Sequence, residues 1–259
     1  METGGSNTAR LLNMPQAMKQ YIDTVKIKLD QLQEQHDILQ TVAALIADKL
    51  SKGHATFSFG ASHAGIITEE LTYRAGGLAT FNPIFTPALA LDVKPVTLTS
   101  RFELVEGFGC QLINSSPLGS GDVILVHSVS GRNPIVLDVA LTAKEKGATV
   151  IAITSMETAR QITSKHTSGK LLHEVADFVI DNAGDYGDAS VKIEGLAQKV
   201  APTSTVIGAA IANSLVVSVA EKLLEMGVTP PVLASANLDG NDRINSNIFE
   251  LYKSQIHYL

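Results

Sequence analysis

Four short runs of apolar residues, separated by segments with helical periodicity, constrain the fold of this 259-residue chain more than any other feature. The runs cover residues 55–60, 122–128, 148–154 and 176–182. DVILVHS and ATVIAIT are apolar on both faces, which is typical of strands covered by helices on both sides of a parallel sheet. Parallel strands joined by helices need right-handed crossovers. The pattern therefore predicts an α/β fold with a doubly wound parallel sheet.

Helical periodicity and helix-ending glycines and prolines mark the connecting segments. We expect helices at residues 15–50 (two helices or one bent helix), 63–75, 134–146, 203–226 and after the Pro230-Pro231 break. Residues 81–121 are less regular, and 166–170 and 184–200 have the composition of loops. We expect one domain over residues 15–259, with an N-terminal helical region at 15–52, a C-terminal extension at 230–259 and a frayed N-terminus at 1–14.

The composition excludes several classes of function. A formal net charge of −6 argues against binding to nucleic acid or to an anionic membrane, because both need a basic surface. Cys110 is the single cysteine, so an internal disulfide and a zinc site built on several thiolates are excluded. The first residues do not resemble a secretory signal, and no run approaches the ~18 apolar residues of a membrane span. We expect a soluble cytoplasmic protein.

Small polar residues follow the predicted strands. Ligands of such sheets bind beyond the carboxyl ends of the strands, where GASH follows the first run and HSVSGRNP lies at the end of the second. Ser128, Ser130 and Asn133 surround Gly131, whose freedom lets the backbone turn close to a ligand, and the N–H groups of the next helix face the same place. The alternative is an ordinary helix cap. Without GxGxxG or a Walker lysine, a single phosphate fits better than a nucleotide.

These segments resemble the sugar isomerase (SIS) domain family, which binds phosphosugars in isomerases, in glucosamine-6-phosphate synthase and in regulators. The matching features are S-x-S-G-x-N after a strand, then a helix and GATVIAIT, with GASH before them and APTST after them. The resemblance covers about residues 40–225 and implies a five-stranded, flavodoxin-like sheet. EELTYRAGG and SANLDGNDRIN also resemble a group of SIS-domain proteins described as phosphosugar isomerases.

The resemblance also implies roles for individual residues. The phosphate-binding hydroxyls of the family correspond to Ser62, Ser128 and Ser130, and Asn133 stands where relatives often have Ser or Thr. Weaker expectations of substrate contact fall on Gly131 and Arg132 in the same loop, and on the APTST hydroxyls of Thr203, Ser204 and Thr205. The alternatives are helix capping for the hydroxyls and a solvated side chain for the arginine.

EELTYR resembles a segment of phosphoheptose isomerases in which the glutamate is a catalytic acid/base, which assigns that role to Glu70, with Glu69 as the fallback. The non-catalytic alternative is a surface ion pair between Glu70 and Arg74 at i, i+4 spacing. A histidine is the natural second acid/base, and His63, directly after Ser62, is our candidate. The late helix has Ile211 to Ser214 where phosphoheptose isomerases place a further histidine, which argues against heptose isomerisation as such.

The hypothesis is a phosphosugar isomerase that moves a proton between C1 and C2 through an enediol. The alternatives are a non-catalytic phosphosugar sensor, or a related amino-sugar phosphate deaminase or etherase. No HxxxH or HExxH motif is present, so we expect neither metal nor cofactor. A homodimer or homotetramer is expected, because the early helices carry more apolar positions than one sheet needs.

Overall fold

The computed structural model describes residues 15–259, so the expectation for residues 1–14 lies outside the described part of the chain. Five parallel strands form one sheet in the order β2-β1-β3-β4-β5. They are β1 (Thr56–Gly60), β2 (Phe81–Pro83), β3 (Val123–His127), β4 (Thr149–Thr154) and β5 (Phe178–Asp181). The predicted doubly wound parallel sheet is confirmed.

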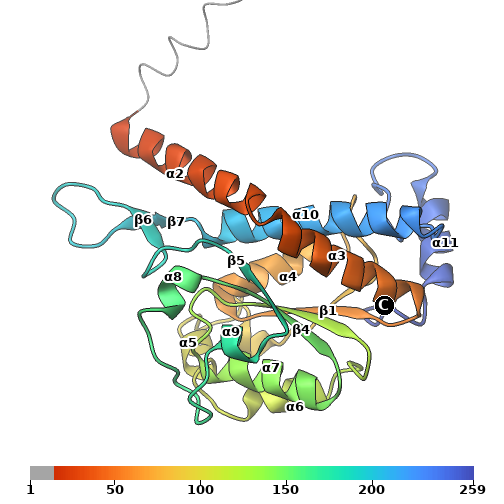
Figure 1. Ribbon diagram of the computed structural model, residues 1–259, viewed down its shortest axis with the longest axis horizontal. Helices are drawn as coiled ribbons and strands as arrows, with labels where there is room; N and C mark the ends of the chain where they lie inside the picture. The colour runs from red at the N-terminus through yellow and green to blue at the C-terminus, as the bar shows by residue number, and fades with distance from the viewer. Residues whose placement is uncertain (1–14) are drawn as a thin grey trace, which may run out of the picture.

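Helices cover both faces of this sheet (Figure 1). On one face lie α3 (His36–Ser51), α4 (Ile66–Leu71) and α10 (Ser204–Glu225), with α2 (Gln16–Gln33) leading into α3. On the other face lie α6 (Phe108–Asn114), α7 (Pro134–Glu145) and α9 (Leu172–Val175). This arrangement explains why the strands are apolar on both faces.

The central strand β3 shows how the two cores are built. Val123 and Leu125 join the cluster under α3 and α10, whereas Ile124 and Val126 join the cluster under α6 and α7. Successive side chains of a strand point to opposite faces, so one five-residue strand supplies both cores. The strand is entirely buried, which fixes its register and the position of the loop that follows it.

The structure differs from the sequence-based expectations in four segments. The less regular region contains the edge strand β2, the 3₁₀ turn η2 (Pro87–Leu89) and the short helix α5 (Leu98–Phe102). The segment expected to be a loop contains an antiparallel pair, β6 (Ala189–Val191) and β7 (Val200–Pro202). The helix expected at 63–75 is replaced by η1 (Ser62–Gly65) and the shorter α4, because Thr72 is extended and Tyr73 is left-handed. The terminal helix, which we expect from the sequence to end at Tyr258-Leu259, is α11 (Asn241–Leu251) and stops before the chain end.

Among residues 15–259, α10 is the one helix long and apolar enough to cross a membrane by length and composition. It passes this test on average hydropathy, although Asn213, Ser214 and Ser218 interrupt its apolar residues. Its residues Ile207, Ile211 and Leu215 are fully buried in the cluster that it shares with α3 and the sheet. Long buried helices of a domain core pass the same compositional test.

Candidate functional site

The carboxyl ends of β1 and β3 lie level with each other, because Gly60 pairs in register with His127. The loops that leave these two strands therefore start side by side. With the segment around α5 they enclose a cavity of about 520 Å³. Its lining includes five of the residues predicted from the sequence, which are Ser62, His63, Ser128, Ser130 and Asn133.

The loop after β1 is tightly folded. A Cβ atom on Gly60 would lie 2.3 Å from the carbonyl oxygen of Ala64, so only glycine permits this turn. Ser62 follows with φ +51°, a left-handed conformation that serine rarely adopts. Such conformations persist where the surrounding structure imposes them, and they cluster at ligand sites. This strained turn directs Ser62 to the cavity.

The loop after β3 is stabilised by a hydrogen bond between two of its own residues. The Ser128 hydroxyl accepts a hydrogen bond from the N–H of Gly131 at 3.1 Å. Gly131 has φ +59°, and a Cβ atom there would lie 2.9 Å from Cβ of Leu172. The predicted turn at Gly131 is therefore confirmed, while direct contact of this residue with a ligand stays a prediction.

Asn133 precedes α7, but its side chain does not cap the helix. It donates instead to Oε2 of Glu103 at 2.9 Å, at the wall of the cavity. The ordinary-cap interpretation therefore does not describe Asn133. The residue lines the cavity instead.

Glu103 is a charged cavity residue that the sequence did not indicate. Its Oε1 accepts a hydrogen bond from the Ser62 hydroxyl at 2.7 Å, opposite the contact with Asn133. Its backbone oxygen accepts the N–H of Ile135 in the first turn of α7 at 3.2 Å. Glu103 follows α5 in a stretch without a clear periodicity, so no sequence signal could have identified it.

His127 lies behind the loops rather than in the cavity. Asn182 donates to its Nε2 at 3.3 Å, which places the ring hydrogen on Nδ1, 3.1 Å from the carbonyl oxygen of Ala64. Burial lowers the pKa of His127 below its ordinary value, because the charged imidazolium would be desolvated. A neutral imidazole therefore ties the ends of β3 and β5 to the loop that carries Ser62.

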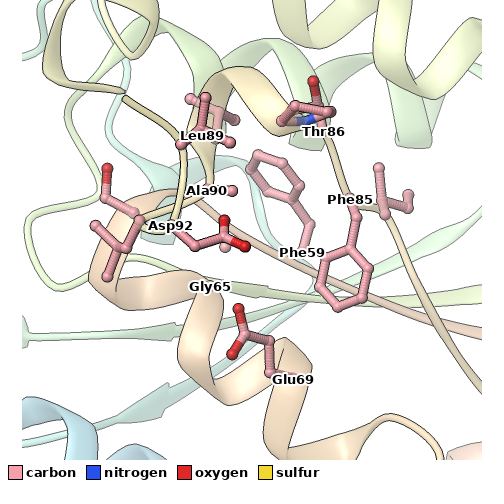
Figure 2. Close-up of a pocket in the computed structure, with 14 residues that line it drawn as sticks. Phe59, Gly65, Glu69, Phe85, Thr86, Leu89, Ala90 and Asp92 are labelled. Atoms are coloured by element: carbon pink, nitrogen blue, oxygen red, sulfur yellow. The ribbon is translucent and has the colours of Figure 1, made fainter. Parts of the chain in front are cut away.

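A second cavity of about 420 Å³ adjoins the first, and Ser62 lines both. Figure 2 shows the carboxylates of Glu69 and Asp92 pointing into it, next to the apolar rings of Phe59 and Phe85. A polar site at one end and an apolar wall with two carboxylates at the other can hold a small polyhydroxylated molecule.

The two neighbouring glutamates of α4 face different surroundings. Glu70 forms the predicted ion pair with Arg74 and accepts a hydrogen bond from Asn213 of α10 at 2.8 Å. It lines neither cavity, whereas Glu69 lines the smaller one. Exposed His63 lines the larger cavity. The structure thus brings His63, but not Glu70, next to the predicted phosphate residues.

The remaining predicted residues lie apart from the cavities. Thr203 is fully buried and accepts a hydrogen bond from Nζ of Lys28 at 2.8 Å, at the start of α10 beside Ser204 and Thr205. Arg132 is half-buried, and its backbone oxygen accepts the N–H of Lys165. Within residues 15–259, no group of three His, Cys, Asp or Glu side chains is placed to hold a metal ion.

Comparison with known proteins agrees with this architecture. The family model of the SIS domain matches residues 20–155. A phosphoheptose isomerase from Francisella tularensis has a similar fold, with a TM-score of 0.51 at 15% identity over 79% of this chain and 96% of that chain.

Two relatives match nearly end to end. A UPF0309 protein of Shouchella clausii is 49% identical over 93% of this chain and 99% of its own length. A UPF0309 protein of Streptomyces coelicolor is 37% identical over 87% of this chain and 90% of its own. The chain is therefore a SIS-domain protein and belongs to the UPF0309 family.

Proposed function

We propose that the larger cavity binds the phosphoryl group of a sugar phosphate. The observation that carries this proposal is the convergence of Ser62, Ser128, Ser130 and Asn133 at the ends of two adjacent parallel strands, beside the first turn of α7. Hydroxyl and amide donors at a helix start suit an anion. The family membership and the fold shared with a phosphoheptose isomerase support the same ligand class.

We further propose that the protein is an aldose–ketose isomerase. One carboxylate would remove the proton from C2 of the open-chain aldose phosphate and return it to C1, while the O2 proton passes to O1 through an enediol. Glu69 fits this task, because it faces the cavity next to Ser62, whereas Glu70, assigned by the resemblance, is engaged by Arg74 and Asn213. His63, at the rim of the phosphate cavity, would assist ring opening.

The experiment that tests isomerisation is incubation with hexose, pentose, heptose and amino-sugar phosphates in deuterium oxide. Deuterium should enter C1 or C2 of one of them, as followed by NMR. The matched variants Glu69→Gln and Glu70→Gln assign the base: turnover should fall at least ~100-fold in the first and persist in the second. The reverse result would return the role to Glu70, and no exchange with any substrate would refute the isomerase.

The engagement of Glu70 by Arg74 and Asn213 favours one alternative, a phosphosugar sensor without turnover. A sensor would be stabilised by a sugar phosphate that it never converts. Release of ammonia or cleavage of an ether would instead indicate an amino-sugar phosphate deaminase or an etherase. Product analysis on the same substrate panel separates these reactions from isomerisation.

We also propose a homodimer or homotetramer. Helix α2 exposes apolar side chains, and the most exposed are Met18 at 53% and Ile27 at 58%. Apolar faces of this kind are typical of surfaces that pack against another chain. A monomeric mass by light scattering at micromolar concentration would contradict this. A cytoplasmic location and the lack of nucleic-acid, membrane, metal or cofactor partners remain predictions.

A further inference from the structure

Glu103 lines the cavity in which the phosphate is proposed to bind, and its carboxylate is bonded to two of the residues assigned to the phosphate. Ser62 donates to one of its oxygens at 2.7 Å, and Asn133 donates to the other at 2.9 Å. Its backbone oxygen accepts the N–H of Ile135 in the first turn of α7. Two donors assigned to the phosphate and one N–H group of the helix start are therefore satisfied by a single residue of the chain itself.

Hydrogen-bond stoichiometry prevents simultaneous use of the Ser62 hydroxyl by Glu103 and a phosphate. A serine hydroxyl carries one hydrogen, and that of Ser62 is committed to Glu103. An ionised carboxylate and a phosphate dianion only accept hydrogen bonds, so neither can donate to the other. The phosphate can gain the Ser62 hydrogen bond only when Glu103 releases it.

Charge leads to the same conclusion. The larger cavity contains the carboxylates of Glu103 and Asp188, and none of the described residues that line it is a lysine or an arginine. A phosphate beside Glu103 would therefore meet like charge in a partly enclosed space, with no lysine or arginine among the described lining residues to offset it. Moving Glu103 away removes the closest of these charges.

We expect the segment that carries Glu103 to be able to move. Residues 91–105 supply walls of both cavities and contain the short helix α5. Their apolar side chains Val93, Val96, Leu104 and Val105 are exposed, whereas Phe102 packs against Phe108 and the core. Segments with few buried apolar contacts open at low free-energy cost.

We propose that Glu103 is an internal anion that occupies the phosphate site of the ligand-free protein. The phosphoryl group binds by displacing this carboxylate, and residues 91–105 move with it. This inference rests on the proposed phosphosugar function. It adds that Glu103 competes with the phosphoryl group and thereby lowers the affinity of the site for phosphate.

The test is titration of the full chain with inorganic phosphate by calorimetry at constant pH and ionic strength. Glu103→Gln removes the charge and keeps an acceptor for Ser62, whereas Glu103→Ala removes both. Phosphate should bind at least tenfold more tightly to each variant than to the wild type. Glu106→Gln is the matched control, because Glu106 contacts Thr167 outside the cavity, and its affinity should equal the wild-type value.

Each other outcome overturns the proposal. Equal phosphate affinity in wild type and both Glu103 variants would refute the internal anion and leave the phosphate site standing. Weaker binding in the variants would show that Glu103 contacts the ligand instead of competing with it. No binding of phosphate or of any sugar phosphate by wild type or variants would refute the proposed function together with this inference.

Hydrogen exchange supplies a second readout in the wild type. Amides of residues 91–105 should exchange faster when phosphate is bound, because the Glu103 contacts that hold the segment are lost. Unchanged or slower exchange with phosphate bound would contradict displacement.

Discussion

Two polar regions of this protein differ in the groups to which their side chains bond. In the Asn82 cluster, which is Asn82 with its backbone partners, the side chain bonds to backbone; in the strand-end cavity, Ser62 and Asn133 bond to the side chain of Glu103. Under the C-terminal tail, Asn82 is 1% exposed and is fully satisfied by backbone groups. Its side-chain nitrogen donates to the carbonyls of Thr56, Thr80 and Gln255, and its oxygen accepts the N–H of His257 at 2.6 Å. Two of these hydrogen bonds join the edge strand β2 to Gln255 and His257, which follow α11.

In the strand-end cavity, the polar side chains bond to another side chain rather than to buried backbone, or have no hydrogen-bond partner among the described residues. Ser62 and Asn133 donate to the side chain of Glu103, and Ser130 lines the cavity with no hydrogen bond to any residue that the structure describes. A polar group bonded to buried backbone contributes to folding, whereas a polar group facing an open cavity is available to a ligand. The comparison predicts that substitutions in the two clusters have separable effects.

The largest expected effect is on stability in the Asn82 cluster. Asn82→Ala removes four hydrogen bonds and leaves buried carbonyl and N–H groups unpaired, which should lower the free energy of unfolding by about 3–5 kcal/mol. Urea denaturation followed by circular dichroism measures the loss. A change below about 1 kcal/mol would refute the structural role assigned to this cluster.

His127 shares features of both regions. It is buried like Asn82, and its hydrogen bond to Ala64 positions the loop that carries Ser62. His127→Phe leaves Ala64 and Asn182 without their partner and should cost about 2–3 kcal/mol of unfolding free energy. The folded-state pKa of His127 lies below 6.5, so below about pH 6.5 the unfolded chain takes up a proton that the folded chain does not.

Stability should therefore fall as the pH drops from 6.5, and part of this slope should vanish in His127→Phe. Denaturation of both proteins between pH 7.5 and 5 measures the difference. Identical slopes would show that the imidazole is not held neutral.

Asn133→Ala tests the cavity side of the comparison. Among residues 15–259 the side chain is bonded to Glu103 alone, so its loss should change the unfolding free energy by less than about 1 kcal/mol. Removing one donor to an anion should weaken phosphosugar binding about tenfold or more. Denaturation and calorimetry on the same preparation give both values. A large stability loss with unchanged affinity would reverse the assignment.

The smallest expected effect concerns the titration of Tyr258 in the C-terminal tail at alkaline pH. Burial, together with the nearby Tyr73, raises the pKa of Tyr258 to about 12, and its hydroxyl donates to the carbonyl of Ala79. The unfolded chain loses this proton near pH 10, so the stabilisation is complete below pH 10 and is lost between pH 10 and about 12.

Ultraviolet absorbance of wild type and Tyr258→Phe should therefore differ only in the last part of the tyrosine titration. A difference centred near pH 10 would show that the tail does not bury this ring.

The sequence predicts the parts of the molecule that depend on local pattern. β3 and β4 are apolar runs, and the rule that ligands bind beyond the strand ends identifies Ser62, Ser128, Ser130 and Asn133, which line one cavity. β2 could not be found, because it is three residues long and contains Pro83. Such an edge strand is defined by its partners β1 and the C-terminal tail.

Glu103 and Glu69 show a second limit of prediction from the sequence. Both are glutamates in short or irregular segments, and only the tertiary structure decides which carboxylate faces a cavity. Glu70 matched the family motif, but its position against α10 depends on how α4 packs, which is not encoded in four neighbouring residues.

The most direct test of the central claim is a thermal-shift and calorimetric comparison of wild type with Ser128→Ala, using the panel of sugar phosphates and the matching unphosphorylated sugars. We predict that at least one sugar phosphate raises the melting temperature of the wild type, that its unphosphorylated form does not, and that Ser128→Ala loses most of the shift. A shift that is equal with the free sugar, or that survives in Ser128→Ala, would contradict a phosphate site at the ends of β1 and β3.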